Sequence, residues 1–350
     1  MIENSCILPG MNTKKFTQLL MQWHKEKNKR TMPWKGETNP YKVWLSEIIL
    51  QQTRVEQGWK YYENFVRQYP TVQRLAGAKD EDVYKLWEGL GYYSRCKNLL
   101  ITARLVAGKC NGKFPSTYEG LLSLKGVGPY TASAIASFCF HLPYPVVDGN
   151  VYRVLARVSG NSTAIDSTAG KHIFYKLAAS ALDEKAPGAY NQAIMDFGAT
   201  VCKPLAPLCN ECALQKICAA YKTATVNMLP VKEKMLQKKT RWFTYFVFEV
   251  KGRLLLHQRT GNDIWQNLYE FYMQETDTAI NWNKAGIEEF LLRQLNISNT
   301  EIIDIMQAKP QQLTHRFIKG WFIKIRLKKI PASLNHSGYE WAEPEEMKQY

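Results

Sequence analysis

Four cysteines crowded into one short segment give the clearest sign of chemistry in this sequence. They are spaced as Cys202-x6-Cys209-x2-Cys212-x5-Cys218, close enough to surround one metal centre without ligands from elsewhere in the chain. Four thiolates at uneven spacing are typical of a cubane iron–sulfur cluster. Zinc, which more commonly uses two separated Cys-x2-Cys pairs, is the alternative metal, and four unligated buried thiols are the remaining interpretation.

Glu47 lies among apolar residues of an expected helix. Val43, Trp44, Leu50 and Gln51 all lie about one helical turn from it. Apolar surroundings disfavour the charged form of a carboxyl, so we expect a raised pKa and a proton available for donation near neutrality. A surface glutamate at the edge of the helix is the alternative.

Asp148 comes just before the expected helix that carries Arg153 and Arg157. Its position is that of an N-cap, and a capping aspartate is expected to stay ionised and can face a developing cation. One protonated and one ionised carboxyl are the pair needed to cleave a glycosidic bond through an oxocarbenium-like transition state. The sequence by itself does not bring Glu47 and Asp148 together.

A glycine hairpin joins two helical segments at Lys125-Gly126-Val127-Gly128, with Pro129 in the first turn of the following helix. Two glycines one residue apart permit backbone conformations that other residues avoid. Exposed N–H groups beside a helix N-terminus make a binding site for a phosphate. On the glycines alone, an ordinary helix–helix turn would be the preferred interpretation.

The elements that must position these residues are helices over the first two thirds of the chain. Apolar periodicity and turn residues predict helices over 41–52, 71–76, 80–87, 96–107, 118–123, 130–139, 151–158, 171–182 and 190–200. We expect an all-α region of roughly nine or ten helices from Phe16 to about Ala220.

The pattern changes after a basic stretch that has no sustained apolar face. Strands are predicted over 242–250, 253–258 and 321–330, the first two joined as a hairpin by Lys251-Gly252, and a helix over 283–295. We therefore predict a multidomain chain: an all-α domain over 12–221, a basic linker over 222–241 and a smaller α+β domain over 242–350.

Charge and composition narrow the class of protein. Apolar residues make up 45% of the chain, which excludes wholesale disorder, and no apolar run reaches membrane-spanning length. The N-terminus lacks the pattern of a signal peptide, so we expect a soluble protein in the cytoplasm. The net charge of +15 arises entirely before residue 242, where the cysteines, carboxylates and hairpin also lie. Such an excess favours a nucleic acid partner.

Together the hairpin and the cysteine spacing resemble the helix-hairpin-helix DNA glycosylases of the endonuclease III superfamily. Members with lyase activity carry a lysine nucleophile two residues after the second hairpin glycine, where this chain has Tyr130. Loss of that amine removes the Schiff-base route. The resemblance therefore implies base excision without strand cleavage, by a protein that associates with the nucleoid through DNA.

Five further motifs resemble the MutY family of adenine DNA glycosylases: Pro33-Trp34, Ser46-Glu47 through Thr53, Leu90-Gly91-Tyr92-Tyr93, Val147-Asp148-Gly149-Asn150-Val151, and Asn191-Gln192 through Ala199. This resemblance implies removal of adenine opposite 8-oxoguanine or guanine in double-stranded DNA, by a monomer with a [4Fe-4S] cluster on the four cysteines.

The roles implied by the family follow residue by residue. Glu47 would protonate adenine and Asp148 would stabilise the sugar cation, assisted by Tyr130 and Asn150. Trp34 and Gln192 would line the pocket for an extruded base, which must leave the stack to be reached. The lesion strand would be contacted by Gln52, Thr53, Leu90 and Tyr92, and the hairpin, Lys125 to Gly128, would bind phosphate.

The resemblance also implies a Nudix-like second domain that reads the oxidised guanine. The lesion-reading triplet, typically Phe-Ser-His, is Leu313-Thr314-His315 here, so the hydroxyl and imidazole are kept and the aromatic ring is absent. No acidic metal box of the Nudix type is present in the sequence. An endonuclease III-like pyrimidine glycosylase with lyase activity and a non-catalytic DNA-binding protein are the competing hypotheses.

Overall fold

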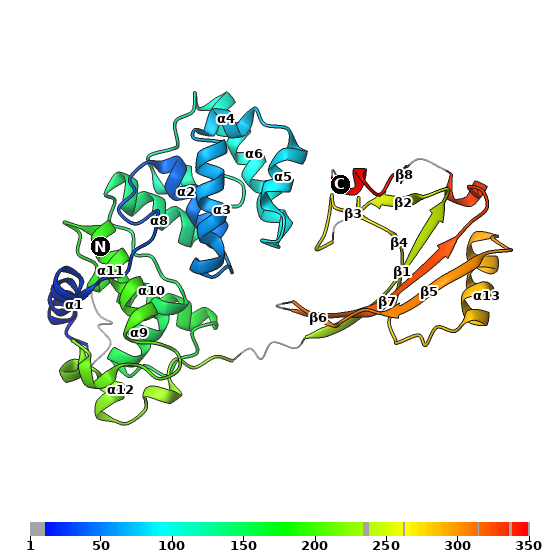
Figure 1. Ribbon diagram of the computed structural model, residues 1–350. Coiled ribbons are helices and arrows are strands. Elements are labelled where there is room, and N and C mark those ends of the chain that lie inside the picture. The colour runs from blue at the N-terminus through cyan, green and yellow to red at the C-terminus, as the bar shows by residue number, and fades with distance from the viewer. Residues whose placement is uncertain (1–10, 234–237, 262, 314, 336–337, 349–350) are drawn as a thin grey trace. The chain divides into compact units, whose positions relative to one another are not determined.

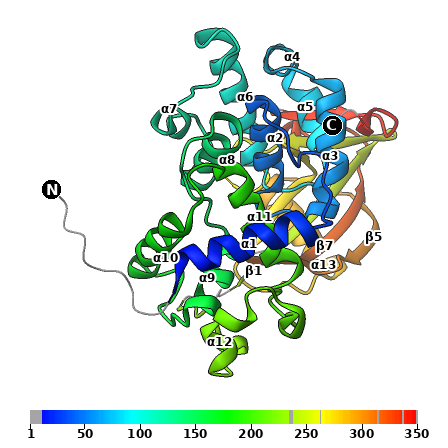
Figure 2. The ribbon, with the colours of Figure 1, turned by 90° about the vertical axis from the view of Figure 1, so that its left-hand side faces the viewer.

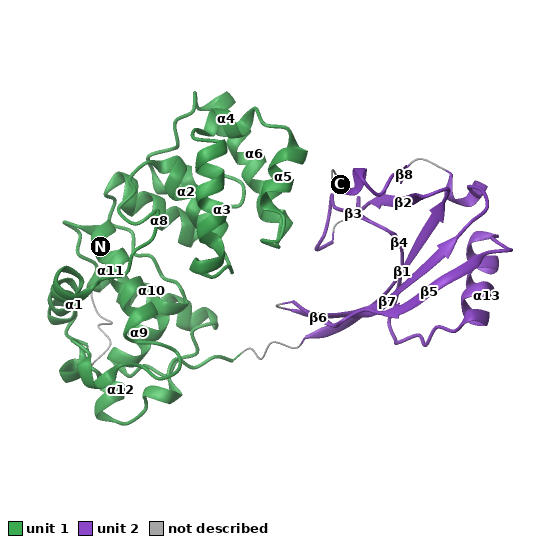
Figure 3. Cartoon of the chain, in the orientation of Figure 1, with its two compact units in different colours: residues 1–234 green, residues 235–350 purple. Residues whose placement is uncertain are grey.

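A computed structural model describes residues 11–233, 238–261, 263–313, 315–335 and 338–348. The chain divides into two compact units, residues 1–234 and 235–350 (Figure 1 and Figure 3). The first is helical and the second is built on a mixed sheet, which confirms the predicted fold class. Within the described residues, no helix combines the length and the apolar character needed to cross a membrane.

The described part of the first unit contains more helices than the nine or ten expected. They are α1 (Thr13–Lys27), α2 (Pro40–Leu50), α3 (Val55–Gln68), α4 (Val72–Ala76), α5 (Asp80–Trp87), α6 (Tyr93–Lys109), α7 (Tyr118–Leu122), α8 (Pro129–Phe140), α9 (Gly149–Ser159), α10 (Thr168–Ala181), α11 (Pro187–Thr200) and α12 (Ala219–Lys222). The helix ranges predicted from sequence do not include α1, α3 or α12. Helix α1 packs against α10 and α11 (Figure 2).

Local capping fixes where the three helices nearest the two carboxylates begin. Asn39 caps α2 through its side chain, and Pro40 occupies the first turn. Gly128 precedes α8 and Pro129 begins it. Asp148 caps α9 by accepting a hydrogen bond from the backbone N–H of Val151, as the sequence predicts. Because α2 packs on α8, and α11 on both α8 and α9, these helix ends converge.

The second unit contains one sheet and one α-helix among its described residues. The strands are β1 (Lys239–Val250), β2 (Arg253–Gln258), β3 (Tyr269–Glu270), β4 (Tyr272–Thr276), β5 (Glu301–Gln307), β6 (Gln311–Gln312), β7 (Arg316–Arg326) and β8 (Tyr339–Ala342), and the helix is α13 (Lys284–Leu295). The central order is β3-β2-β1-β7-β5, with β1 and β7 parallel and the other pairs antiparallel. Phe246, Phe248 and Ile323 from the sheet and Ile287 and Leu291 from α13 share one core.

Two predicted boundaries in this region are wrong. The strand expected over 321–330 runs instead over Arg316–Arg326, and β1 begins at Lys239, inside the stretch interpreted as linker. Both differences have one cause, since Lys239 pairs with Arg316 at the start of the parallel β1–β7 ladder. Pairing between strands far apart in sequence overrides the local basic pattern.

Gly198 allows α11 to approach α9 closely. A Cβ at this position would lie 2.7 Å from Asn150 Cβ and 3.0 Å from the Asn150 carbonyl oxygen. We therefore expect Gly198→Ala to lower the free energy of unfolding by about 1–3 kcal/mol, the usual cost of forcing extra volume into a packed contact.

The matched control is Gly108→Ala on α6, where a Cβ would meet no atom within 4 Å. It should stabilise the protein by roughly 0.5–1 kcal/mol through helix propensity. Urea unfolding of the full chain measures both changes. Equal effects of the two substitutions would contradict the close approach of α11 and α9.

Candidate active site

A cavity of about 620 Å³ lies where α2, α8, α11 and the start of α9 meet the segment around Trp34. Seven of the residues selected from sequence line it: Trp34, Glu47, Thr53, Tyr130, Asp148, Asn150 and Gln192. The structure therefore brings the two carboxylates into one cavity, which the sequence alone could not establish.

The Glu47 carboxyl is almost withdrawn from water, with 8% of the residue exposed. Burial raises its pKa to about 7, the nearby charge of Asp148 adds to the rise, and a hydrogen bond with Tyr130 opposes it. The expectation of a raised pKa from the apolar neighbours is confirmed. Near neutral pH this side chain can hold a proton and release it.

Asp148 combines capping with a place in the cavity. Its Oδ1 accepts from Val151 N at 2.8 Å, and its Oδ2 accepts from Asn150 Nδ2 at 2.7 Å. Burial raises the pKa of this carboxyl, outweighing the two hydrogen bonds and the charge of Arg153, which lower it. The sequence predicted the cap but not the upward direction of the pKa, because burial depends on α11 and α8.

Tyr130 occupies the first turn of α8 and lines the cavity. Its hydroxyl is hydrogen-bonded to Glu47 and lies 3.6 Å from Met195 Sδ. Burial, followed by the charges of Glu47 and Asp148, raises the pKa of the phenol well above 10. The phenol therefore remains a neutral hydrogen-bond donor in this cavity.

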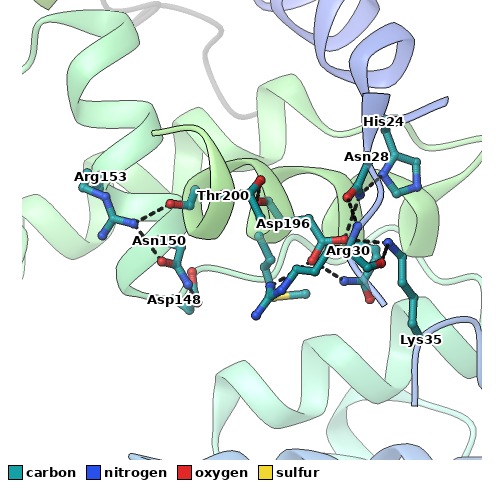
Figure 4. A network of polar contacts seen from close by, with 12 residues as sticks. His24, Asn28, Arg30, Lys35, Asp148, Asn150, Arg153, Asp196 and Thr200 are labelled. Carbon is teal, nitrogen blue, oxygen red and sulfur yellow. Dashed lines mark hydrogen bonds and ion pairs between the residues drawn. The ribbon is translucent and has the colours of Figure 1, made fainter. Parts of the chain in front are cut away.

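Arg153 contacts Asn150 (Figure 4), a residue that lines the cavity, and it also contacts the cysteine segment. Its guanidinium donates to Asn150 Oδ1 at 2.8 Å, to the Gly198 carbonyl at 2.8 Å and to the Cys202 carbonyl at 2.7 Å. The sequence showed Arg153 only as a residue of the capped helix. Its bonding to Gly198 and Cys202 spans more than forty residues of chain and has no local signal.

A second polar group surrounds Asp196 on α11, whose side chain is fully buried. Its carboxylate forms ion pairs with Arg30 at 2.9 Å and Lys35 at 3.0 Å (Figure 4). It also accepts hydrogen bonds from the side-chain amides of Asn28 at 2.8 Å and Gln192 at 3.0 Å. Arg30, Lys35 and Gln192 also line the cavity. Asp196 was visible in sequence only as part of a motif and carried no predicted role.

The four cysteines lie between α11 and α12, on a segment shaped by two short 3-10 turns, Cys209–Glu211 and Gln215–Ile217. Cys202, Cys212 and Cys218 pack against the core that α9 and α11 share. Arg157 donates to Cys202 Sγ at 3.5 Å and its carbonyl accepts from Cys218 Sγ at 3.4 Å. Arg157 therefore contacts two of the four cysteines directly.

The spacing of the thiols bears on which metal fits them. In the described ranges, no three ligating side chains converge closely enough to hold a single metal ion. The four thiols still influence one another electrostatically, because the pKa of Cys212 responds to all three others. Four thiols carried on one short segment are the donor set that a cubane cluster takes.

The hairpin has the backbone that its glycines predicted. Gly126 has a φ of +80°, in the left-handed region, and Gly128 directly precedes α8 with open space where a Cβ would lie. Lys125 is exposed, its carbonyl accepting from Thr102 at 2.8 Å, while Val127 is buried. An exposed lysine and a helix N-terminus therefore stand together at the surface.

Three other selected residues lie outside the cavity but close to Thr53, which lines it. Gln52 and Tyr92 are exposed and have positive φ angles of 55° and 50°, whereas Leu90 is only 5% exposed. Arg95 connects this group: it donates to Thr53 Oγ1 at 3.3 Å and the Leu90 carbonyl at 3.4 Å, and lies 5.2 to 5.4 Å from the rings of Trp87 and Tyr92. No local pattern in the sequence singles out Arg95.

In the second unit, His315 is exposed directly before β7, and Thr314 lies outside the described residues. The backbone here is anchored to β1, since Lys239 N donates to the His315 carbonyl at 3.3 Å. The neighbouring Arg316 is paired with Asp263 at 3.3 Å. These contacts connect the segment of His315 to both β1 and Asp263.

Burial of Glu47 makes stability depend on pH. Its pKa is about 7 in the folded protein against 4.5 for an exposed glutamate, so the folded state binds the proton more tightly. This contribution is fully present below about pH 4.5 and is lost as pH rises through about 7. We expect Glu47→Gln, measured by urea unfolding, to stabilise the protein at about pH 8 by on the order of 3 kcal/mol.

The gain should vanish below about pH 3.5, where Glu47 is protonated in both states. Glu37→Gln provides the opposite control: burial would raise the pKa of Glu37, but hydrogen bonds from the Asn39 backbone and from Lys42 lower it overall. That substitution should destabilise the protein at pH 8. A Glu47→Gln effect of the same size at both pH values would be inconsistent with a raised pKa.

Comparison with known proteins places these features in a family. Residues 45–178 match the HhH-GPD superfamily of base excision DNA repair proteins. An adenine DNA glycosylase of Buchnera aphidicola (subsp. Schizaphis graminum) is 35% identical, over 78% of this chain and 80% of that protein. Another, from the subspecies Baizongia pistaciae, is 32% identical over 95% of this chain and 92% of its own length.

Solved structures agree on the fold of the helical unit. A thermostable thymine-DNA glycosylase is 26% identical with a TM-score of 0.56, covering 60% of this chain and 97% of that one. Endonuclease III in a non-covalent DNA complex is 20% identical with a TM-score of 0.52, covering 61% of this chain and 98% of its own. By the extent and identity of these matches, the chain belongs to the adenine DNA glycosylase family.

Proposed function

We propose that the protein is a monofunctional glycosylase that hydrolyses the N-glycosidic bond of adenine mispaired with 8-oxoguanine or guanine in double-stranded DNA. The observation that carries this proposal is the pairing of Glu47, with a pKa near 7, and Asp148 in one cavity. Such a pair supplies an acid for the leaving base and a carboxylate for the sugar.

The reaction follows from these two environments. Glu47 donates its proton to adenine N7, so that the base leaves as a neutral group when the bond from C1′ to N9 breaks. Asp148 faces the positive charge that develops on the sugar, and its ionised form is favoured as that charge appears. Water then adds to C1′ and gives up a proton, which restores the acid.

Tyr130 and Asn150 assist by holding the two carboxylates. The Tyr130 hydroxyl bonds Glu47, and the Asn150 amide bonds Asp148 at 2.7 Å. Tyr130 occupies the position of the lyase lysine and has no amine to attack the sugar. Two lysines do line the cavity: Lys35, which is engaged by Asp196 at 3.0 Å and by the Arg30 carbonyl at 2.6 Å, and the exposed Lys185. The phenol at position 130 is the feature that favours hydrolysis over an endonuclease III-like lyase reaction.

The remaining cavity and loop residues bind the substrate in this proposal. Trp34 and Gln192 receive the extruded adenine, while Gln52, Thr53, Leu90 and Tyr92 contact the strand opposite. The exposed Tyr92 can place its ring in the space that the extruded base leaves in the duplex, whereas the buried Leu90 can contribute mainly through its backbone. In the second unit, Thr314 and His315 read the oxidised guanine.

Phosphate contacts and positive charge would provide the affinity for DNA. The phosphate-binding site would be the backbone of the hairpin, Lys125 to Gly128. The net charge of +15, which arises before residue 242, would add attraction to the phosphates along the duplex. The two units, residues 1–234 and 235–350, would act together in one monomer. The enzyme would work on chromosomal DNA in the cytoplasm.

Cys202, Cys209, Cys212 and Cys218 would hold a [4Fe-4S] cluster. In this position the cluster would supply structure rather than chemistry at the sugar, because it would fix the segment that α9 contacts through Arg153 and Arg157. A non-catalytic DNA-binding protein could use the hairpin and cluster equally well. Such a binding protein would have no use for a buried carboxyl with a raised pKa, so it leaves Glu47 unexplained.

Excision can be tested with duplexes that carry adenine opposite 8-oxoguanine, guanine or cytosine, analysed with and without alkali. We expect strand breaks at the adenine only after alkali, and only opposite 8-oxoguanine and guanine. Glu47→Gln and Asp148→Asn should each bind DNA yet lose excision by about 100-fold or more, the usual range for an acid or charge contribution.

Glu119→Gln, at an exposed site on α7, should retain the wild-type rate. Breaks without alkali would indicate the lyase, and no breaks in either sample would indicate the binding protein. Wild-type turnover by Glu47→Gln or Asp148→Asn would refute the role of that residue.

The cluster can be tested by colour and metal content after purification without oxygen. We expect a yellow-brown protein with about four iron atoms per chain. Cys212→Ser should lower the iron content, while Cys110→Ser, a free cysteine remote in sequence from the cluster segment, should not. A colourless protein with stoichiometric zinc would rule out the cluster.

A further inference from the structure

The Asp196 carboxylate has both oxygens occupied inside the fold (Figure 4). Oδ1 accepts from Arg30 Nη1 at 2.9 Å and from Gln192 Nε2 at 3.0 Å. Oδ2 accepts from Asn28 Nδ2 at 2.8 Å and lies 3.0 Å from Lys35 Nζ. The side chain is fully buried, so these four donors replace the water that the carboxylate has lost.

One of these bonds fixes the orientation of an amide. A carboxylate offers only acceptors, so Gln192 must turn its NH₂ group toward Asp196. The two ends of a glutamine amide are nearly equal in size, and hydrogen bonding alone decides which end points where. The Gln192 carbonyl oxygen is then the end left for the cavity, and no donor in the described residues bonds it.

We infer that Asp196 is a positioning residue that sets which purine the cavity accepts, an inference that rests on the proposed function. With its amide held in this orientation, Gln192 presents an acceptor to the cavity. In this inference the acceptor faces the group at C6 of the base, the ring position next to the N7 side that Glu47 protonates in the proposed function. Adenine has an amino group at C6 and can donate to it. Hypoxanthine has the same size and ring nitrogens but a carbonyl at C6, and would bring two acceptors together.

The surroundings of Asp196 suit this positioning role. Gln192 and Asp196 are one turn apart on α11, so the amide and its partner move as one rigid element. Arg30, Lys35 and Asn28 come from the chain between α1 and α2 and hold the carboxylate from the other side. Asp196 itself does not line the cavity.

The test compares single-turnover excision of adenine and of hypoxanthine, each opposite 8-oxoguanine, by the full-length protein. In Asp196→Asn the new amide can donate to Gln192 as well as accept from it, so both orientations of Gln192 become available. The ratio of the adenine rate to the hypoxanthine rate should fall roughly tenfold, the effect of one neutral hydrogen bond.

Two comparisons separate this role from a general loss of stability. Gln192→Leu, which leaves the other three donors to Asp196 in place, should lower the ratio by itself, and adding Asp196→Asn should lower it no further. Asn28→Ala removes a donor to Oδ2 but leaves the Gln192 bond to Oδ1, so the ratio should stay at the wild-type value.

An unchanged ratio in Asp196→Asn would overturn the inference, and so would an equal fall with and without the Gln192 side chain. If Asp196→Asn does not fold, an unchanged ratio in Gln192→Leu alone overturns it. If the wild type removes no adenine from any duplex, the proposed function itself fails and this inference fails with it.

Discussion

The withdrawal of the Glu47 carboxyl from water is the constraint on which the rest of the structure depends. A buried carboxyl is costly in its charged form, and that cost is what keeps a proton on it near neutrality. Helix α2 must therefore be enclosed, and Ile48 and Ile49 beside Glu47 are almost fully buried. Arg95 closes the end of the helix by donating to the carbonyls of Ile48 and Ile49 at 2.8 to 2.9 Å. The same guanidinium reaches Thr53 and the Leu90 carbonyl, so the enclosure of the acid also positions the adjacent surface.

Two arginines of α9 connect the acid site with the cysteine segment. Arg153 bonds Asn150 at one side and the Cys202 carbonyl at the other. One turn later, Arg157 bonds Cys202 Sγ, the Lys203 carbonyl and the carbonyls of Val226 and Leu229. The helix that begins with Asp148 thus runs from the cavity to the segment that would hold the cluster. A metal centre at this place would stabilise α9 and, through it, the geometry of Asp148.

The part of the site that sequence could predict is the part with a local signal. Cysteine spacing, the apolar neighbours of Glu47, the cap at Asp148 and the left-handed Gly126 each depend on residues within a few positions. The contributions of Arg95 and Asp196 could not be predicted, because each depends on partners far away in sequence: Ile49 and Gln51 are 46 and 44 residues from Arg95, and Asn28 and Arg30 are 168 and 166 residues from Asp196. The start of β1 could not be predicted for the same reason. Lys239 belongs to the strand because it pairs with Arg316, whereas its neighbours in sequence are typical of a linker. Enclosure by distant helices also explains why the pKa of Asp148 rises, against the expectation for an exposed cap.

The central claim is that Glu47 carries a proton near neutral pH because the fold buries it. Carboxyl ¹³C NMR of the full-length protein, labelled at the glutamate side chains, measures this directly. The account predicts one carboxyl resonance that titrates near pH 7 and is absent from the Glu47→Gln variant. If every glutamate resonance titrated below about pH 5, in the range of exposed carboxyls, the account would be contradicted.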